Sequence, residues 1–386
     1  NPIYQCNLAI VYYGAIYVPR DIDKAIYYFT LSADQNYDLS QTNLGIIYSD
    51  GKYVKPDVSK ALHYFKLAEK QNEPKAIFHL GLLYYEGKIV PIDIDKAIDY
   101  FTNAAKRNNK NAQFYLGMIY FDKFDFKKSI YYFTLSADQS HQDAQKMLGF
   151  IYLFINDVKN INKSIYYFKL AAEQYCYESN FFLGNIYCEG KFVLRNYEKA
   201  IYYYKNASSF NNDISKNNLG VIYKNIVKNI GFAKELFEEA IKKRNKLAFY
   251  NLAHLYFYDI ASDDYIDKTI DLLFQSIKND FEPLMILLSL AIVKKISTVD
   301  LNNIKSETNK HGNISQDINQ KILNTIEENN LENQDSYNSV YLTYKKLDFV
   351  YGYKCETVPF LDFTSYDFEK EKLTKKLLNQ KNIDKF

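Results

Sequence analysis

Two short motifs alternate along most of this sequence. The first, L-G-x-x-Y, occurs at residues 44–48, 80–84, 116–120, 148–152, 183–187 and 219–223, with near-copies at 8–12 and 252–256. The second, K-[A/S]-[I/L]-x-Y-[F/Y], occurs at residues 24–29, 60–65, 96–101, 128–133, 163–168 and 199–204. A unit of this size cannot bury its apolar residues alone, so the repetition predicts a stack of similar units in which each covers the next.

An Asp or Asn precedes the lysine of each second motif by three residues, and the rule continues where the motif degenerates. These positions are Asp21, Asp57, Asp93, Asp125, Asn160, Asn196, Asn229 and Asp264. Asp and Asn are favoured at helix N-caps because their side chains accept a hydrogen bond from the first turn. From Asp21 to Asn229, each cap lies 24 residues before the glycine (or Ala253) of the next first motif, whereas the distance from glycine to the following cap ranges from 8 to 12. A rigid helix–turn–helix cassette with variable surface loops explains both spacings.

The residue periodicity within a cassette is that of amphipathic helices. Around the second motif, one face carries Ala61, Tyr64, Phe65 and Ala68, and around the first motif one face carries Ala76, Leu80 and Tyr84. Gly81 lies in the middle of the latter helix and weakens it by about 1 kcal/mol relative to Ala. We therefore expect the glycine to allow a close approach between helices.

These motifs resemble the Sel-1-like repeat family, which is related to the tetratricopeptide repeat. The resemblance rests on the A-x-x-x-L-G-x-x-Y run, the Asp cap, the run KAIDYFTNAA at 96–105 and the G-K-x-V loops at 51–54, 87–90 and 190–193. It implies an all-α protein: an α-solenoid of about eight to nine antiparallel helix-pair repeats in a right-handed superhelix, with a C-terminal non-repeat tail. It also implies a scaffold or adaptor. Some units lack the G-K-x-V loop, and Tyr or Ser replaces several expected alanines.

The repeats lose their pattern towards the C-terminus. We predict a solenoid over residues 1–296, a polar helical capping segment over 297–331, and a tail over 332–386 whose fold the sequence does not indicate. The chain opens inside a repeat, which leaves open a catalytic domain before residue 1.

Composition excludes several classes of function. The formal net charge is +2 and no long basic stripe is present, which argues against nucleic acid as the partner. No apolar run reaches the roughly 18 residues of a transmembrane helix. Four cysteines (Cys6, Cys176, Cys188 and Cys355) and five histidines show no metal-ligand spacing, and no phosphate loop or catalytic constellation is found. We therefore predict no metal, no cofactor and no enzymatic activity, and buried thiols in a reducing compartment.

The remaining candidate site is a groove along the first-motif helices. By 100° per residue, the face opposite the Ala-Leu-Tyr core falls three residues before, one after and four after each motif glycine. The residues we assign to partner binding on this face are Phe78, Leu82, Tyr85, Phe114, Met118, Phe121, Phe150, Phe181 and Asn185. Such an aromatic groove suits an apolar or helical peptide. The alternative is that these side chains pack against neighbouring first-motif helices.

Three functional hypotheses follow. The first is a non-enzymatic cytoplasmic scaffold that binds protein or peptide partners through the concave surface. The second is a lumenal quality-control adaptor of the endoplasmic reticulum, associated with a ubiquitin ligase. Three glycosylation sequons, at Asn162, Asn206 and Asn313, favour this hypothesis. The third is the regulatory arm of a larger signalling enzyme such as a protein kinase. The partner's identity and the oligomeric state stay open.

Overall fold

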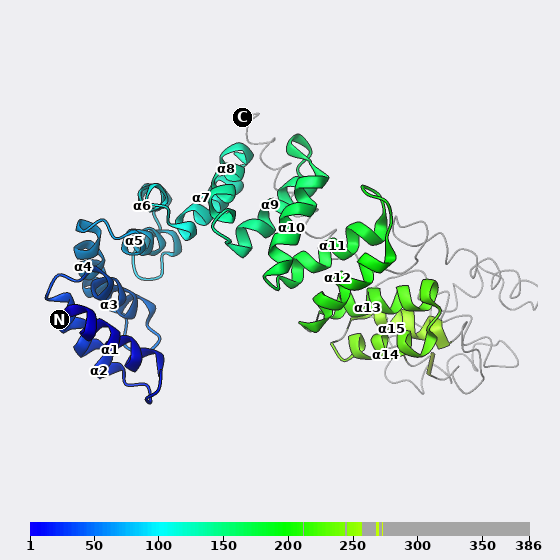
Figure 1. Ribbon diagram of the computed structural model, residues 1–386, viewed down its shortest axis with the longest axis horizontal. Coiled ribbons are helices and arrows are strands. Elements are labelled where there is room, and N and C mark those ends of the chain that lie inside the picture. The colour runs from blue at the N-terminus through cyan, green and yellow to red at the C-terminus, as the bar shows by residue number, and fades with distance from the viewer. Residues whose placement is uncertain (211, 244, 257–267, 270–271, 273–386) are drawn as a thin grey trace, which may run out of the picture. The chain divides into compact units, whose positions relative to one another are not determined.

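The computed structural model describes residues 1–256 apart from 211 and 244, together with 268, 269 and 272 (Figure 1). Within these residues the fold is all-α and contains no strand. The α-helices are α1 (Pro2–Gly14), α2 (Ile22–Ala33), α3 (Asp38–Asp50), α4 (Val58–Lys70), α5 (Pro74–Glu86), α6 (Ile94–Lys106), α7 (Lys110–Asp122), α8 (Phe126–Ala137), α9 (Gln142–Phe154), α10 (Ile161–Glu173), α11 (Tyr177–Glu189), α12 (Tyr197–Ser209), α13 (Asp213–Ile222), α14 (Ile230–Ile241) and α15 (Lys246–His254). A 3₁₀ turn, η1 (Asn156–Val158), follows α9, and a π-helical turn, η2 (Tyr223–Val227), follows α13.

The chain divides into two compact units, residues 1–174 and 175–386. Within each unit, every odd-numbered helix packs against the helix that follows it: α1 with α2 through α9 with α10 in the first, α11 with α12 and α13 with α14 in the second. This confirms the predicted helix-pair repeat. The predicted capping segment 297–331, the tail 332–386 and the cap Asp264 lie outside the described residues.

All seven predicted caps within the described residues begin a helix. The side chains of Asp21, Asp57, Asp93, Asp125, Asn160, Asn196 and Asn229 each accept a hydrogen bond of 2.8–3.0 Å from the backbone N–H three residues later. The backbone N–H of each cap also donates to the carbonyl of the preceding motif tyrosine (Tyr223 for Asn229), at 2.8–3.2 Å. The cap therefore closes the loop behind it and starts the helix ahead of it.

Each motif glycine lies against an aromatic ring of the next helix. The pairs are Gly45–Phe65, Gly81–Phe101, Gly117–Phe133, Gly149–Phe168, Gly184–Tyr204 and Gly220–Phe237. A Cβ atom added at Gly81 would lie only 2.7 Å from two ring carbons of Phe101. The expected close approach between the two helices is thus confirmed: the aromatic ring of one helix packs directly on the backbone of the other at the glycine.

The motif tyrosine makes a second recurring contact. Its ring lies parallel to a tyrosine of the next helix, with centroids 5.6–6.1 Å apart and planes within 4–8°, in Tyr12–Tyr28, Tyr48–Tyr64, Tyr84–Tyr100, Tyr120–Tyr132, Tyr152–Tyr167 and Tyr187–Tyr203. The motif lysine places its ammonium 4.8–5.2 Å from the first ring's centroid in every pair. Offset stacking and a cation–π contact each favour this arrangement. The abundant tyrosines therefore have a structural role in each repeat.

Serine replaces the expected alanine after the motif lysine in two repeats, and in both the buried serine hydroxyl has a hydrogen-bond partner. The buried Ser129 hydroxyl donates to the Gly117 carbonyl at 2.9 Å, and the Ser164 hydroxyl donates to the Gly149 carbonyl at 2.7 Å. Each bond joins the two helices of a pair. The replacement thus adds a polar tie at the glycine contact.

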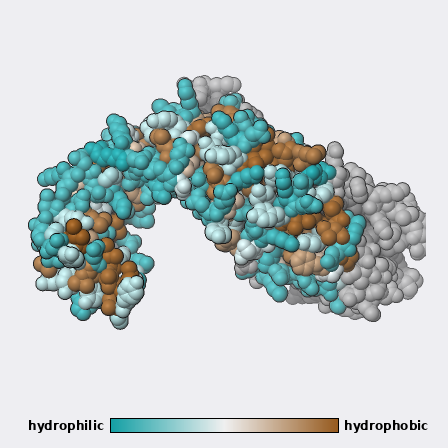
Figure 2. Space-filling model, viewed as in Figure 1, coloured by the Kyte–Doolittle hydropathy of each residue, from teal (hydrophilic) through white to brown (hydrophobic). Residues whose placement is uncertain are grey.

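The surface of the first unit is uneven in polarity. Figure 2 shows hydrophobic side chains gathered over α1, where Ile3 and Leu8 are exposed, and hydrophilic ones over α4. Cys6, Cys176 and Cys188 are buried and form no disulfide. None of the described helices has the length and apolar character needed to cross a membrane.

Candidate protein-binding face

The nine residues assigned to partner binding all lie on odd-numbered helices, and we call the surface formed by their positions (three before, one after and four after each motif glycine) the odd-helix face. The structure divides them into two groups. Phe78, Phe121, Phe150, Phe181 and Asn185 are buried. Leu82, Tyr85, Phe114 and Met118 are partly exposed. The accessible members of the nine therefore lie on α5 and α7.

Aromatic contacts hold both buried and partly exposed residues of this set in place. Phe78 lies 5.6 Å from Tyr115 and 5.7 Å from Phe101 between ring centroids, so it packs between α5, α6 and α7. Phe114 stacks on the His141 ring of α9 at 4.7 Å and 15°. The alternative expectation, packing against neighbouring helices, therefore describes Phe78 well and Phe114 in part.

Tyr85 completes this aromatic group. Its ring meets Tyr115 edge to face at 5.3 Å and 83°. Burial raises the pKa of Tyr115, and the nearby Glu86 carboxylate acts in the same direction. Tyr115 therefore stays a neutral phenol at physiological pH and can offer its hydroxyl group beside an apolar contact.

Two other assigned residues turn towards side chains of their own unit. Phe121 meets Phe126 of α8 edge to face at 5.8 Å, and Phe150 lies 4.6 Å from Phe154 on the same helix. These positions strengthen the packing of the unit.

In the second unit, the odd-helix face is buried and polar. Asn185 accepts a 2.7 Å hydrogen bond from the Tyr204 hydroxyl, and Phe181 packs 6.2 Å from the same ring. The Asn218 amide donates to the Tyr204 hydroxyl at 3.4 Å. Tyr204, which takes the place of phenylalanine against Gly184, thus uses its hydroxyl to join α11 with α13.

Sequence reasoning stopped at α11 and missed the polar residues at the same positions of the last repeats. Asn217 accepts a 2.8 Å hydrogen bond from the Asn251 amide, and the Lys224 ammonium lies 2.6 Å from Nδ1 of His254. All four side chains are buried. Continuing the count from Gly220 and Ala253 would have found three of them.

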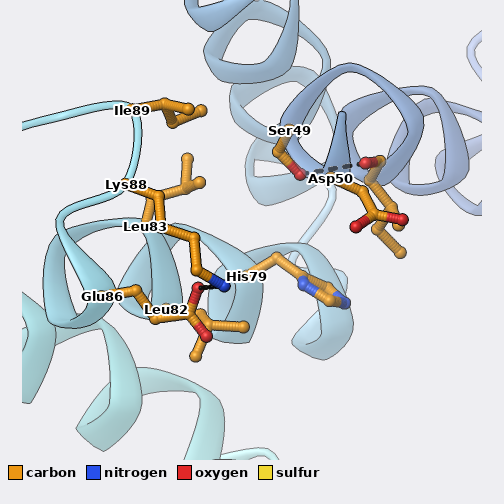
Figure 3. A pocket seen from close by; sticks show the side chains of 9 residues that line it. Ser49, Asp50, His79, Leu82, Leu83, Glu86, Lys88 and Ile89 are labelled. Carbon is orange, nitrogen blue, oxygen red and sulfur yellow. Dashed lines mark hydrogen bonds and ion pairs between the residues drawn. The ribbon is translucent and has the colours of Figure 1, made fainter. Parts of the chain in front are cut away.

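A cleft opens between α3 and α5 on the odd-helix face of the first unit (Figure 3). Its volume is about 210 Å³, and Ile46, Ser49, Asp50, His79, Leu82, Leu83, Glu86, Lys88 and Ile89 line it. Figure 3 shows Ser49 and Asp50 on the α3 side and the Glu86–Lys88 pair and His79 on the α5 side. Leu82 belongs to the predicted partner-binding set.

Charges in this cleft come from three side chains. The Lys88 ammonium pairs with the Glu86 carboxylate at 2.8 Å, and this hydrogen bond raises the pKa of Lys88. Burial lowers the pKa of His79 to about 4, and the positive charge of Lys75 adds to the effect. Asp50 is exposed and makes no ion pair with a described residue. At neutral pH the cleft therefore holds two carboxylates, one ammonium and a neutral imidazole.

The acidic residues of the cleft were also missed at the sequence level. Asp50 and Glu86 occupy the fifth position after their motif glycines, one step beyond the positions that were counted, and Asp122 occupies it in α7. In each case this residue is the last of its helix. The signal was present as a recurring acid at a helix C-terminus, where the helix dipole disfavours negative charge.

Other sequence-level candidates carry no site here. Among the residues that the structure describes, no group of three His, Cys, Asp or Glu side chains could hold a metal ion. The sequons at Asn162 and Asn206 lie inside α10 and α12, and Asn313 lies outside the described residues.

Comparisons with known proteins agree with this repeat architecture. A model of the Sel1 repeat matches residues 2–37, 38–73, 74–109, 110–141, 142–176 and 178–209. Among solved structures, c5321, a protective antigen present in uropathogenic Escherichia coli strains, is similar with a TM-score of 0.64 and 21% identity, over 90% of this chain and 76% of that one. A Sel1 repeat protein from Oxalobacter formigenes has a TM-score of 0.52 and 26% identity, over 63% of this chain and 100% of its own. No curated protein matches the chain.

Proposed function

Because this chain belongs to the Sel1 repeat family, whose repeats cover more than half of its length, we propose that it is a non-enzymatic scaffold that binds protein or peptide partners along the odd-helix face of residues 1–174. Repeats of this kind are typical of protein-interaction scaffolds, in which stacked units present an extended binding surface. The compartment in this proposal is the cytoplasm, where the free, buried thiols Cys6, Cys176 and Cys188 stay reduced.

One observation carries the proposal. Four residues of the odd-helix face are partly exposed: Leu82, Tyr85, Phe114 and Met118. The Tyr115 ring packs against the rings of Phe78 and Tyr85 and so holds this aromatic group in place. Aromatic and apolar side chains held in one conformation lose little entropy on binding, which makes them suitable anchors. A surface of this kind, on two consecutive repeats, suits an apolar or helical peptide segment.

The experiment compares two faces of the same chain. Partners are captured from the source cells, identified and purified, and their Kd is measured for wild type, Met118→Asp and Tyr131→Asp. Met118 lies on the odd-helix face, and Tyr131 is exposed on α8, an even-numbered helix. We expect Met118→Asp to weaken binding by about tenfold or more, since a charge would enter the apolar contact, and Tyr131→Asp to leave binding unchanged.

Thermal melts of the three proteins exclude unfolding as the cause. Equal loss of affinity in both variants, or loss in Tyr131→Asp alone, would assign binding to another surface. A reaction catalysed by the purified chain and abolished by a point substitution would replace the scaffold proposal with an enzymatic one.

A further inference from the structure

The cleft between α3 and α5 combines an apolar lining with unbalanced charge. Ile46, Leu83 and Ile89 border the buried core formed by Ala61, Phe65, Ala68, Ala76 and Leu80. Its volume of about 210 Å³ is below the roughly 300–1,000 Å³ of pockets that hold small-molecule ligands. A cleft of this size and position fits one long side chain of a peptide that lies along the odd-helix face.

The charges determine which side chain fits. Among the residues that line the cleft, two carboxylates and one ammonium give a net charge of −1, because His79 is neutral, and the positive charge of Lys75 acts on His79 from outside this lining. Glu86 is already paired with Lys88. Asp50 makes no such pair, and the adjacent Lys52 lies over the Tyr53 ring, 4.9 Å from its centroid. The field of Asp50 does reach across to Lys88, where it contributes to the raised pKa of that ammonium. An incoming cation would therefore meet a carboxylate that is in no ion pair with a described residue, and it would share the field of that carboxylate with the ammonium groups of Lys52 and Lys88.

The position of the two acids adds to this negative potential. Asp50 ends α3 and Glu86 ends α5, and the C-terminus of a helix carries a partial negative charge from its free carbonyl groups. An acid in the last turn is locally unfavourable. A bound cation would offset both the carboxylate and the helix dipole at the same point.

We propose that this cleft binds a lysine or arginine side chain of a partner peptide, with the aliphatic stem against Ile46, Leu82 and Leu83 and the charged group at Asp50. The long methylene chains of these residues pack on apolar surface while their charged ends stay near water. This inference rests on the proposed function, since it specifies the partner of the same face. It predicts a basic residue next to the apolar anchors that occupy α5 and α7.

The test uses the full chain and a library of short fluorescent peptides whose central residue is lysine, arginine, norleucine, glutamine or glutamate, with all flanking positions randomised among apolar residues. Wild type should bind the lysine and arginine pools most tightly. Asp50→Asn should weaken binding of these pools by about twofold to fivefold, the range for one partly screened ion pair. Lys88→Gln, which lowers the net charge of the residues lining the cleft from −1 to −2, should strengthen binding of these pools by a similar factor.

A matched control separates the cleft from the overall charge of the protein. Asp99→Asn removes the same charge from an exposed position on α6, an even-numbered helix, and should leave the Kd of every pool unchanged. Equal binding of the norleucine and lysine pools by wild type, or equal effects of Asp50→Asn and Asp99→Asn, would overturn this inference and leave the scaffold function standing. Failure of every pool to bind would contradict both.

Discussion

Individual glycines determine how closely the two helices of a repeat approach. Gly81 lies under the Phe101 ring, and the same glycine–ring contact recurs in six helix pairs of the described chain. The ring is completely buried in this position. A glycine that weakens its helix locally thus allows a large aromatic side chain to be buried against the backbone.

We predict that Gly81→Ala destabilises the protein by about 1–3 kcal/mol although alanine is the better helix former. The added methyl group would lie 2.7 Å from Phe101 and 3.2 Å from Cβ of Tyr100, so the ring must shift. Urea unfolding measures the change. Phe101→Leu in the same chain should recover part of it, because the smaller side chain leaves room for the methyl group.

Gly231→Ala is the matched control for this prediction. Gly231 is exposed in α14, and its nearest neighbouring atom would lie 3.8 Å from the new methyl group. This substitution should stabilise the protein by up to about 1 kcal/mol through helix propensity alone. Stabilisation by both substitutions would show that the glycine–ring contact carries no packing constraint.

His79 gives the stability a specific dependence on pH. Its ring stacks on Phe65 at 5.5 Å and 4°, and burial lowers its pKa from 6.5 to about 4. Between these values the unfolded chain binds a proton that the folded chain does not. Protonation of the unfolded chain therefore does not reduce the free energy of unfolding above pH 6.5. As the pH falls towards 4, it reduces the free energy of unfolding by up to about 3 kcal/mol.

The measurement is the free energy of unfolding as a function of pH in wild type and His79→Gln. The variant should lack the part of the slope that His79 contributes between about pH 6.5 and 4. Parallel curves for wild type and His79→Gln would mean that this histidine does not cause the acid sensitivity.

The helices are joined by two kinds of connection, loops that vary in length and short turns of constant conformation. Loops after the odd-numbered helices vary in length, yet each ends at a cap whose N–H returns to the carbonyl of a tyrosine at the end of the preceding helix or turn. Turns after α2, α4, α6 and α8 are short, and each contains one residue with positive φ: Asn36, Asn72, Asn108 and Ser140. Asn adopts this left-handed conformation more readily than most residues. These two devices explain the constant cassette and the variable loop.

We predict that Asn160→Ala destabilises the protein by about 1 kcal/mol, because the first turn of α10 loses the hydrogen bond that the Lys163 N–H donates to Asn160 at 3.0 Å. Asn160→Asp should keep the wild-type stability or exceed it, since Asp21, Asp93 and Asp125 make the same cap and also pair with the following lysine. Urea midpoints at low salt compare the three proteins. A loss of stability in Asn160→Asp equal to that in Asn160→Ala would contradict the capping argument.

The array as a whole is held together mainly by contacts between neighbouring helices. In residues 1–174, each helix contacts the next one along the chain, and in addition α3 contacts α5 and α7 contacts α9. Stability in such an arrangement is the sum of repeat and nearest-neighbour terms, so separate regions can open independently. Damage to one repeat should therefore remain local.

We predict that Phe65→Ala, which removes a fully buried ring at a cost of about 3–5 kcal/mol, lowers hydrogen-exchange protection in α3, α4 and α5 far more than in α9 and α10. Exchange measured by mass spectrometry on the full chain gives the protection of each helix. Tyr131→Ala, at an exposed position, should change no helix. An equal loss of protection in all helices of residues 1–174 would indicate a single cooperative block.

The helices and their spacing could be predicted from the sequence because their causes are local. The seven caps from Asp21 to Asn229, the amphipathic periodicity and the close approach at Gly81 each follow from the chemistry of a few adjacent residues. Repetition then strengthened each inference, since an independent copy of the same motif lay about one helix pair further along the chain. The all-α repeat architecture was determined at that level.

Exposure on the odd-helix face required the three-dimensional arrangement. Phe78 and Phe114 occupy the same position relative to their glycines, yet Phe78 is buried between Phe101 and Tyr115 whereas Phe114 is partly exposed beside His141. What covers such a side chain depends on neighbouring helices whose residues differ from repeat to repeat. The cleft of Asp50 and His79 likewise exists only where two consecutive repeats meet, so no single motif contains it.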